Sequence, residues 1–526
     1  MSSKDQIETN LDRSTKQGLN SKDKAYIADS AEHASQDDEI LEHALPPADS
    51  EERNTLERAL VRKLDLRLLP MIFLIYIMNY IDRNAITSAR LKGLQEDLHL
   101  NNIQYATLIA VLYATYSPAQ IPSNMILHMV KRPSLYIGTC VVLWGLTSAL
   151  TGVTVNYGGI IACRIFIGLP EAAFYPGAMY LLSRWYTRRE LALRSAILYC
   201  GLLLSNAFGT LMAAGILSGM EGAMGIRAWR WLFYIEGAIT VVIGFISMYI
   251  LPDYPNNTRW IVGVDRRLAQ ARLAEDAAEA DIDDSDQSQL HGLKLALKDP
   301  LVLMFALMNM VQLMGLSFIN FFPSLTQTLG FSTTITLLMA SPPWIWASIL
   351  CLGNAWHADR TGERYFHIAA CWWAVMLGYI ISLSTMNIAA RYISLFLMAT
   401  GYSGFAMILT WVSSSVPRPP AKRAVSMGIV NGFGNLGNLI GSYVWDAKWS
   451  PDYHPSLGIC LGALGLTTIL GGTIRQMIIT RNKEMLADEL KLMTESNRVR
   501  IEEAAKLEGI SFEDAMARRR GFKLLY

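Results

Sequence analysis

Long apolar runs dominate this 526-residue sequence and constrain its fold more than any other feature. A helix needs about 20 largely apolar residues to cross the hydrocarbon core of a bilayer. Such runs occur near residues 66–87, 105–127, 134–155, 157–182, 191–218, 229–251, 300–322, 334–356, 365–386, 391–412, 424–446 and 457–478. The sequence therefore predicts an all-α membrane protein with twelve transmembrane helices in two groups of six.

The composition agrees with a membrane environment. Apolar residues make up 52% of the chain and charged residues only 17%, which leaves too little polar surface for a protein surrounded by water. A net charge of +1 provides no basic face for nucleic acid, so we exclude that class of partner. We expect the lipid bilayer to surround most of the chain.

Charged residues crowd into three segments that divide the chain into five parts. Residues 1–63 are polar and rich in Ser, Asp and Glu, and we expect a disordered cytosolic tail there. The other expected parts are a six-helix half at 64–251, a cytosolic connector at 252–299, a second six-helix half at 300–479 and a cytosolic tail at 480–526.

Cations in the short loops predict the orientation, because lysine and arginine are retained on the cytosolic side. One set of loops carries Lys131, Arg132, Arg184, Arg188, Arg189, Arg360, Arg364, Arg418, Lys422 and Arg423. The opposite set carries fewer, namely Arg90, Lys92, Arg227, Arg391 and Lys448. We therefore expect both termini and the connector to be cytosolic.

The cysteines and histidines give no sign of a metal site. All six cysteines fall inside apolar runs, where a thiol behaves as a small hydrophobic group. The eight histidines lie in the tails, in loops or at helix ends. The histidines therefore form no cluster that could hold a catalytic metal at membrane depth, which argues against a membrane-embedded desaturase or metalloprotease. We expect no metal, no cofactor and no enzymatic activity.

Charged residues inside the apolar runs are candidate functional groups, because a charge near the bilayer centre costs at least about 2.5 kcal/mol. The first run contains Asp82 and Arg83, and the fourth contains Arg164 and Glu171. The last two are seven residues apart and share one helical stripe. Glu236 in the sixth run is interpreted as an interfacial or packing residue.

Both charged pairs have a structural and a functional interpretation. Arg164 and Glu171 form either a static buried ion pair or a proton switch, in which Glu171 meets its arginine in one conformation and loses it in another. Asp82 and Arg83 either mark the headgroup boundary or belong to the site.

Uncharged polar residues recur at helical spacing and cannot face lipid without leaving their hydrogen bonds unmade. They either bond between helices or line a solvated path that binds the solute. Tyr76 and Asn79 share one helix face with Arg83. The other candidate binding residues are Tyr113, Gln120, Asn309, Gln312, Asn431 and Asn435.

Glycine pairs four residues apart occur in the eleventh run, at Gly428 with Gly432 and at Gly437 with Gly441. This spacing lets two helix backbones come close. The pairs indicate either tight static packing or a helix that must slide or rock.

Several segments carry recognisable motifs. They are Asn79 to Asn84 (NYIDRN), Ile121 to Asn124 (IPSN), Arg164 to Gly177 (RIFIGLPEAAFYPG), Trp229 to Gly237 (WRWLFYIEG) and the loop Asp359 to Arg364 (DRTGER). Together they resemble the major facilitator superfamily, and more narrowly its anion:cation symporters in the fungal branch of allantoate, nicotinate and related vitamin permeases. Pro170 and Ala173 stand where small residues or glycine are usual, so the local shape of the fourth helix departs from the family pattern.

The resemblance implies a major facilitator fold in which two six-helix halves alternate around a central site. It also implies residue roles. Asp82 and Glu171 carry protons, Arg164 is the partner of Glu171, and Arg83 engages the substrate carboxylate. The loop with Asp359, Arg360, Gly362 and Arg364 matches the superfamily's signature between the eighth and ninth helices.

The function implied by the resemblance is proton-coupled uptake of a small organic carboxylate across a fungal plasma membrane, by a monomer. An interior-negative potential opposes a monoanion by ~2.3 kcal/mol per 100 mV, and one co-transported proton removes that cost. The expected partners are the organic anion and protons. An exporter of a fungal secondary metabolite and a non-transporting nutrient sensor remain open as alternatives.

Overall fold

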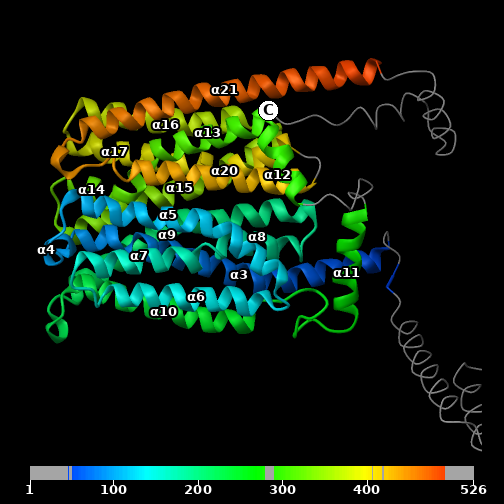
Figure 1. Ribbon diagram of the computed structural model, residues 1–526, viewed down its shortest axis with the longest axis horizontal. Coiled ribbons are helices and arrows are strands. Elements are labelled where there is room, and N and C mark those ends of the chain that lie inside the picture. Colours follow the sequence, from blue (N-terminus) through cyan, green and yellow to red (C-terminus); the bar gives the residue numbers. More distant parts are fainter. Residues whose placement is uncertain (1–44, 47–49, 279–288, 406, 417–419, 492–526) are drawn as a thin grey trace, which may run out of the picture.

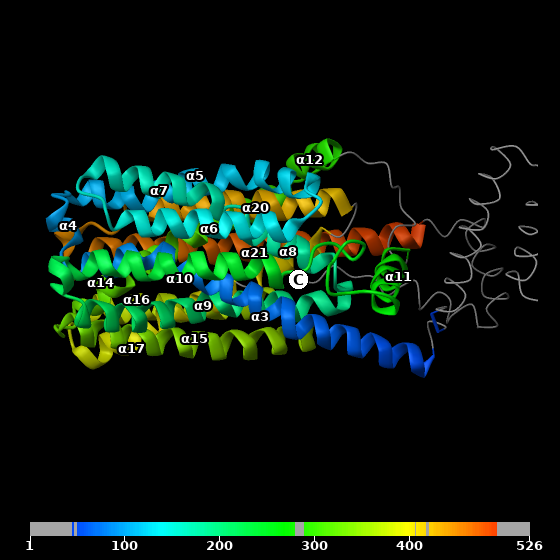
Figure 2. The same cartoon turned by 90° about the horizontal axis from the view of Figure 1, so that it is seen from below.

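The computed structural model describes residues 45–46, 50–278, 289–405, 407–416 and 420–491. In this part of the chain every regular element is a helix. Figures 1 and 2 show a bundle of long helices lying side by side along one axis. In both views α11 and α12 lie at one end of the bundle and α4 at the other.

The first six-helix half is built as predicted. Its elements are α3 (Glu51–Arg90), α4 (Leu94–Asp97), α5 (Asn102–Met129), α6 (Pro133–Thr151), α7 (Tyr157–Glu171), α8 (Phe174–Ser183), α9 (Arg188–Gly219), η1 (Ala223–Gly225) and α10 (Ala228–Ile250). Helices α7 and α8 together form the fourth span. The connector contains α11 (Val264–Ala278) and α12 (Gln289–Lys298).

The second half has the same number of spans, two of them in pieces. Its elements are α13 (Pro300–Gly315), η2 (Ser317–Phe321), α14 (Phe322–Gln327), α15 (Thr333–Thr361), α16 (Tyr365–Ser384), α17 (Ile388–Ala399), α18 (Gly401–Phe405), α19 (Ile408–Ser415), α20 (Pro420–Gly441), η3 (Ala447–Trp449) and α21 (His454–Lys491). The seventh span runs through α13, η2 and α14, and the tenth through α17 to α19. The predicted all-α fold is confirmed.

Ten spans of the described chain are long and apolar enough to cross a membrane by length and composition alone. The other two long helices, α5 and α20, fall outside this group although they have 28 and 22 residues. Both carry amide and hydroxyl side chains along the seam between the two halves. Their lower apolarity therefore reflects their position in the bundle.

The expected disorder of the N-terminal tail was wrong for part of its length. Helix α3 begins at Glu51, so residues 51–63 are helical and do not belong to a disordered tail. Ser50 caps this helix, and Leu60, Leu64 and Leu68 are buried along one face, which gives the extension an apolar stripe. Helix α21 likewise continues to Lys491. The remainder of both expected tails lies outside the described residues.

The two halves meet along α5 with α20 and α9 with α15. Toward the end that holds α4, hydrogen bonds join the halves directly. Asn102 Nδ2 donates to Asp446 Oδ1 at 3.4 Å, and the hydroxyls of Thr107 and Tyr443 lie 3.1 Å apart. Any rocking of the halves has to break these bonds.

The glycine pairs of α20 differ in their surroundings. A methyl group at Gly437 would overlap the Met310 carbonyl of α13, and one at Gly441 would overlap the Ser317 side chain. Gly428 and Gly432 have no heavy atom within 4 Å of that position. Only the second pair therefore serves the close approach of backbones that its spacing predicts.

Candidate functional site

A buried ion pair occupies the middle of the first half. Arg83 on α3 places Nη2 2.6 Å and Nε 2.8 Å from Glu171 Oε1. The exposed fractions of these side chains are 6% and 1%. A pair this deeply buried resists separation, because removing one partner leaves an uncompensated charge in a medium of low dielectric constant.

Glu171 reaches Arg83 because the fourth span is broken at this residue. Helix α7 ends at Glu171 and α8 starts at Phe174. Pro170 lacks a backbone N–H and its ring crowds the preceding turn, so a regular helix cannot continue unperturbed through this segment. The departure from the family pattern at residues 170 and 173 coincides with this break.

In this structure Glu171 pairs with Arg83 and not with Arg164. Seven residues on one helix separate two side chains by about 10 Å along its axis, and Arg83 on the adjacent helix is closer. Arg164 is nevertheless buried, with an exposed fraction of 1%, and its Nη2 donates to the Arg83 carbonyl at 3.2 Å. Its Nε and Nη1 have no hydrogen-bond partner among the described residues.

Asp82 takes part in a different set of contacts from its neighbour Arg83. Its carboxylate accepts hydrogen bonds from Thr240 Oγ1 at 2.6 Å, Ser148 Oγ at 2.8 Å and Trp144 Nε1 at 3.3 Å. These donors come from α6 and α10, and the exposed fraction of Asp82 is 1%. Asp82 therefore joins α3 to α6 and α10 inside the first half.

Aromatic rings surround the Arg83 guanidinium. Its central carbon lies 4.6 Å from the ring centre of Tyr116, 4.8 Å from that of Tyr80 and 5.7 Å from that of Tyr113. Tyrosine faces attract a cation and can also stack on a flat ligand. The cage holds the guanidinium at the edge of an internal cavity.

This cavity lies between the two halves. Its polar lining consists of Tyr76, Tyr80, Arg83, Asn84, Tyr113, Tyr116, Tyr175, Tyr199, Asn320, Tyr402, Asn431, Asn435 and Asn438. Two hydrogen bonds cross from one half to the other here. Tyr113 Oη donates to Asn320 Oδ1 at 3.2 Å, and Asn431 Nδ2 donates to Gln120 Oε1 at 3.4 Å.

The structure brings together five of the predicted binding residues around this cavity, namely Tyr76, Arg83, Tyr113, Asn431 and Asn435. Gln120 joins them through its bond to Asn431. Asn79 is buried on α3 with no partner for its Nδ2 among the described residues.

Two predicted binding residues lie elsewhere. Asn309 and Gln312 are buried inside the second half and do not line the cavity. Asn309 Nδ2 donates to the Val430 carbonyl at 2.9 Å, so this amide joins α13 to α20. Asn309 therefore fits the structural alternative, in which a polar side chain bonds between helices.

The binding prediction omitted several lining residues, among them Tyr80, Asn84, Asn320 and Tyr402. Tyr76, Tyr80 and Asn84 are spaced by four residues and follow one face of α3, so the periodicity could have identified two of them. Asn320 sits in η2, a 3₁₀ segment that interrupts the seventh span, and no periodic signal marks it.

The loop signature lies in the turn from α15 to α16. Gly362 has φ of +68°, a left-handed conformation that glycine adopts without strain at the end of a helix. Arg364 is buried at the start of α16, and Arg360 stacks over Trp356 at 5.7 Å. The side chain of Asp359 is outside the described part of the structure.

Within that part, no group of three or more His, Cys, Asp or Glu side chains could hold a metal ion.

The twelve helices in two halves, with a buried polar cavity between them, define the architecture of a polytopic membrane transporter. The model of the Major Facilitator Superfamily matches residues 72–442. The chain belongs to this superfamily.

Curated relatives agree with this assignment. The MFS-type transporter cnsO of Penicillium expansum is 32% identical, with 81% of this chain and 84% of that protein covered. The major facilitator-type transporter hxnP of Emericella nidulans is 29% identical over 79% of this chain and 85% of the relative.

Solved structures share the fold. A bacterial homologue of the human lysosomal transporter Spinster, in an inward-facing and occupied conformation, aligns with a TM-score of 0.61 at 15% identity and covers 78% of this chain and 96% of its own. A D-xylose-proton symporter aligns with a TM-score of 0.58 at 13% identity, covering 76% and 96%. At these identities the likeness concerns the fold alone.

Proposed function

We propose that this transporter imports a small organic carboxylate together with protons, as a monomer of the anion:cation symporter branch. The observation that supports this most is the Arg83–Glu171 pair at the edge of the central cavity. It places an anion-binding group and a protonatable group in direct contact. The two ligands, carboxylate and proton, are thereby linked through one interaction.

The linkage follows from competition for Arg83. A guanidinium presents a planar donor fork that matches two carboxylate oxygens, and Glu171 already occupies part of that fork. A substrate carboxylate can therefore bind Arg83 only if it displaces Glu171 or if Glu171 is already neutral. Protonation of Glu171 removes its charge, frees Arg83, and so favours binding of the substrate anion.

Arg164 offers Glu171 a second partner. Its Nε and Nη1 are unpartnered among the described residues and point to no other acceptor there. We expect Glu171 to move toward Arg164 when the halves rock and the substrate holds Arg83. In this scheme the exchange of partners is the proton switch, with both arginines used in turn.

The cavity lining suggests the kind of carboxylate. Tyrosine rings surround Arg83, and asparagine amides from α20 also line the cavity. Rings stack on flat ligands and amides bond to ring nitrogens or carbonyls. A planar nitrogen-containing carboxylate such as nicotinate fits this combination, and a plain aliphatic acid would leave the amides unused.

Uptake of labelled nicotinate and allantoate into cells that express the protein tests the proposal, with and without a proton uncoupler. We expect uncoupler-sensitive accumulation of at least one of these acids. Uncoupler-insensitive uptake would remove proton coupling. Efflux of preloaded label without uptake would indicate an exporter, and no movement in either direction at normal surface expression would favour a sensor.

A further inference from the structure

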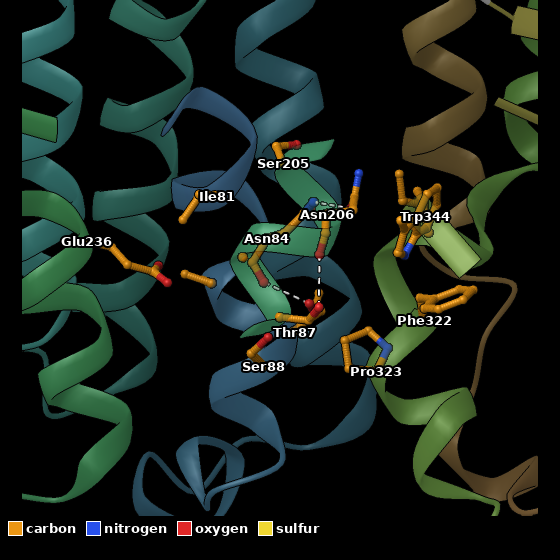
Figure 3. A pocket seen from close by; sticks show the side chains of 14 residues that line it. Ile81, Asn84, Thr87, Ser88, Ser205, Asn206, Glu236, Phe322, Pro323 and Trp344 are labelled. Atoms are coloured by element: carbon orange, nitrogen blue, oxygen red, sulfur yellow. Dashed lines mark hydrogen bonds between the residues drawn. The ribbon is translucent and has the colours of Figure 1, made fainter. Parts of the chain in front are cut away.

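A second cavity adjoins the central one but has a different lining. It lies between α3, α9 and α10 of the first half and η2, α14 and α15 of the second. Figure 3 shows Asn84 and Asn206 in its middle and Glu236 on one flank. Asn84 lines both cavities, and its Nδ2 donates to Asn206 Oδ1 at 2.9 Å.

Several donor hydrogens of the lining are used in bonds to other groups, so the oxygens of these groups remain available as acceptors. Thr87 Oγ1 donates to the Asn84 carbonyl at 2.7 Å, and Ser205 Oγ donates to the Leu202 carbonyl at 2.6 Å. Asn206 Nδ2 also donates to the Leu202 carbonyl, at 2.8 Å. These acceptors suit water that carries an excess proton, or a protonated acid that can donate to them.

Glu236 supplies an acid to this surface. Its exposed fraction is 1%, and Oε2 has no hydrogen-bond partner in the described part of the chain. Burying an ionised carboxylate without a partner costs far more than burying a neutral one. The group therefore carries a proton unless a cation accompanies it.

Asp82 is bonded to α10 one helical turn from Glu236. Thr240 follows Glu236 by one helical turn on α10, and Thr240 donates to Asp82 Oδ2 at 2.6 Å. The other elements packed against α10 contribute neutral groups near Asp82 and the cavity, namely Trp144 and Ser148 from α6 and Ser205 and Thr210 from α9.

The buried charges in this region do not balance if every acid is ionised. Arg83 and Arg164 provide two positive charges, whereas Asp82, Glu171 and Glu236 provide three negative ones. One proton on an acid makes the set neutral. Glu236 is the acid without a recorded donor, whereas Asp82 has three donors and Glu171 is paired with Arg83.

We propose that Glu236 is a second proton-binding site, loaded from this polar cavity and able to pass its proton to Asp82. The proton leaves the O–H of Glu236 and binds a carboxylate oxygen of Asp82. Glu236, now ionised, takes a proton from hydronium in the cavity and releases water. This inference deepens the proposed function and rests on it for the transport step, but proton binding by Glu236 can be tested separately.

Infrared spectroscopy tests the binding step without a substrate. The purified full-length protein is compared at acidic and alkaline pH, and the C=O stretch of buried protonated carboxyls is recorded in H₂O and D₂O. We expect Glu236→Gln to remove one such band and the surface variant Glu221→Gln to retain it, since Glu221 pairs with Arg227 in a partly exposed loop. An unchanged band in Glu236→Gln would overturn the proposal. Loss of the wild-type band on replacing N-methylglucamine chloride by sodium chloride would also overturn it, in favour of a sodium site.

Reconstituted vesicles test the transfer step, with nicotinate as the solute and a pH-sensitive dye inside. We expect Glu236→Gln to lower nicotinate-driven proton entry by about tenfold, equivalent to roughly 1.4 kcal/mol, while nicotinate exchange at equal pH changes much less. Glu236→Asp should restore part of the proton entry with an altered pH profile. Wild-type proton entry in Glu236→Gln would overturn the relay and leave the proposed function intact. Absence of proton entry in the wild type, despite nicotinate exchange, would instead overturn the proposed function.

Discussion

Arg83 and Glu171 are joined by an ion pair of 2.6 Å between Nη2 and Oε1, although they come from different helices and are 88 residues apart in the chain. Neither residue has an exposed fraction above 6%. The geometry couples the charge of Glu171 to the availability of Arg83. The first two predictions test the two sides of this relationship.

Arg83→Lys should raise the apparent KM for a carboxylate by roughly tenfold or more, because lysine keeps the charge but loses the planar donor fork. Arg83→Ala should abolish transport. Concentration-dependent uptake at matched surface expression is the measurement. A wild-type KM in the lysine variant would remove Arg83 from the binding site and weaken the case for an anionic substrate.

Glu171→Gln should abolish accumulation against a gradient while exchange or binding survives, because glutamine keeps the volume and loses the titratable group. Since it also leaves Arg83 free, carboxylate binding should become less dependent on pH. Counterflow and gradient-driven uptake in the same vesicles separate these effects. Normal proton-driven accumulation would reduce the pair to a structural role.

Asp299→Asn tests an ion cluster outside the membrane spans. Burial alone would raise the pKa of Asp299, but hydrogen bonds from Arg481 at 2.5 Å and Lys422 at 2.7 Å outweigh it and hold the pKa below its usual value. Asparagine can still cap α13 through Leu301 N–H, so the substitution removes mainly the charge.

We expect Asp299→Asn to cost about 1–3 kcal/mol of stability at neutral pH. A lowered folded-state pKa contributes stability above the unfolded value, near pH ~3.9, and this contribution is lost as the pH falls through the folded-state pKa. The difference in thermal unfolding between wild type and variant, in detergent, should therefore shrink toward acidic pH. A difference that is constant with pH would contradict the role of the charge.

Gly437→Ala should destabilise the protein by about 1–3 kcal/mol, because the added methyl group overlaps the Met310 backbone and α13 must move away. Gly428→Ala is the matched control on the same helix. It has free space at that position and should be neutral or slightly stabilising, since alanine favours a helix over glycine. Equal unfolding temperatures for Gly437→Ala and Gly428→Ala would contradict the predicted overlap between the added methyl group and the Met310 backbone.

The orientation is tested by labelling single cysteines with a membrane-impermeant thiol reagent. Lys294→Cys on α12 should react only after the cells are permeabilised, if the connector is cytosolic as the loop cations predict. Met224→Cys, at a side chain with an exposed fraction of 85% between α9 and α10, should react in intact cells. The reverse pattern would invert the topology.

The sequence by itself determined the helices and the charged groups at membrane depth. Apolar runs of about 20 residues form helices in lipid, because a helix satisfies all of its backbone hydrogen bonds within one segment. The cost of a buried charge likewise marked Asp82, Arg83, Arg164 and Glu171 without knowledge of any contact. These inferences depend only on local composition, which can be read from the sequence without knowledge of the fold.

Only the tertiary structure decided the partners. Residue spacing suggested that Glu171 pairs with Arg164, whereas the break after α7 and the approach of α3 bring Arg83 to it. Helical periodicity also could not tell Asn309, which bonds to Val430, from Asn320, which lines the cavity. Such choices depend on how helices rotate and approach one another, and packing between distant segments sets both.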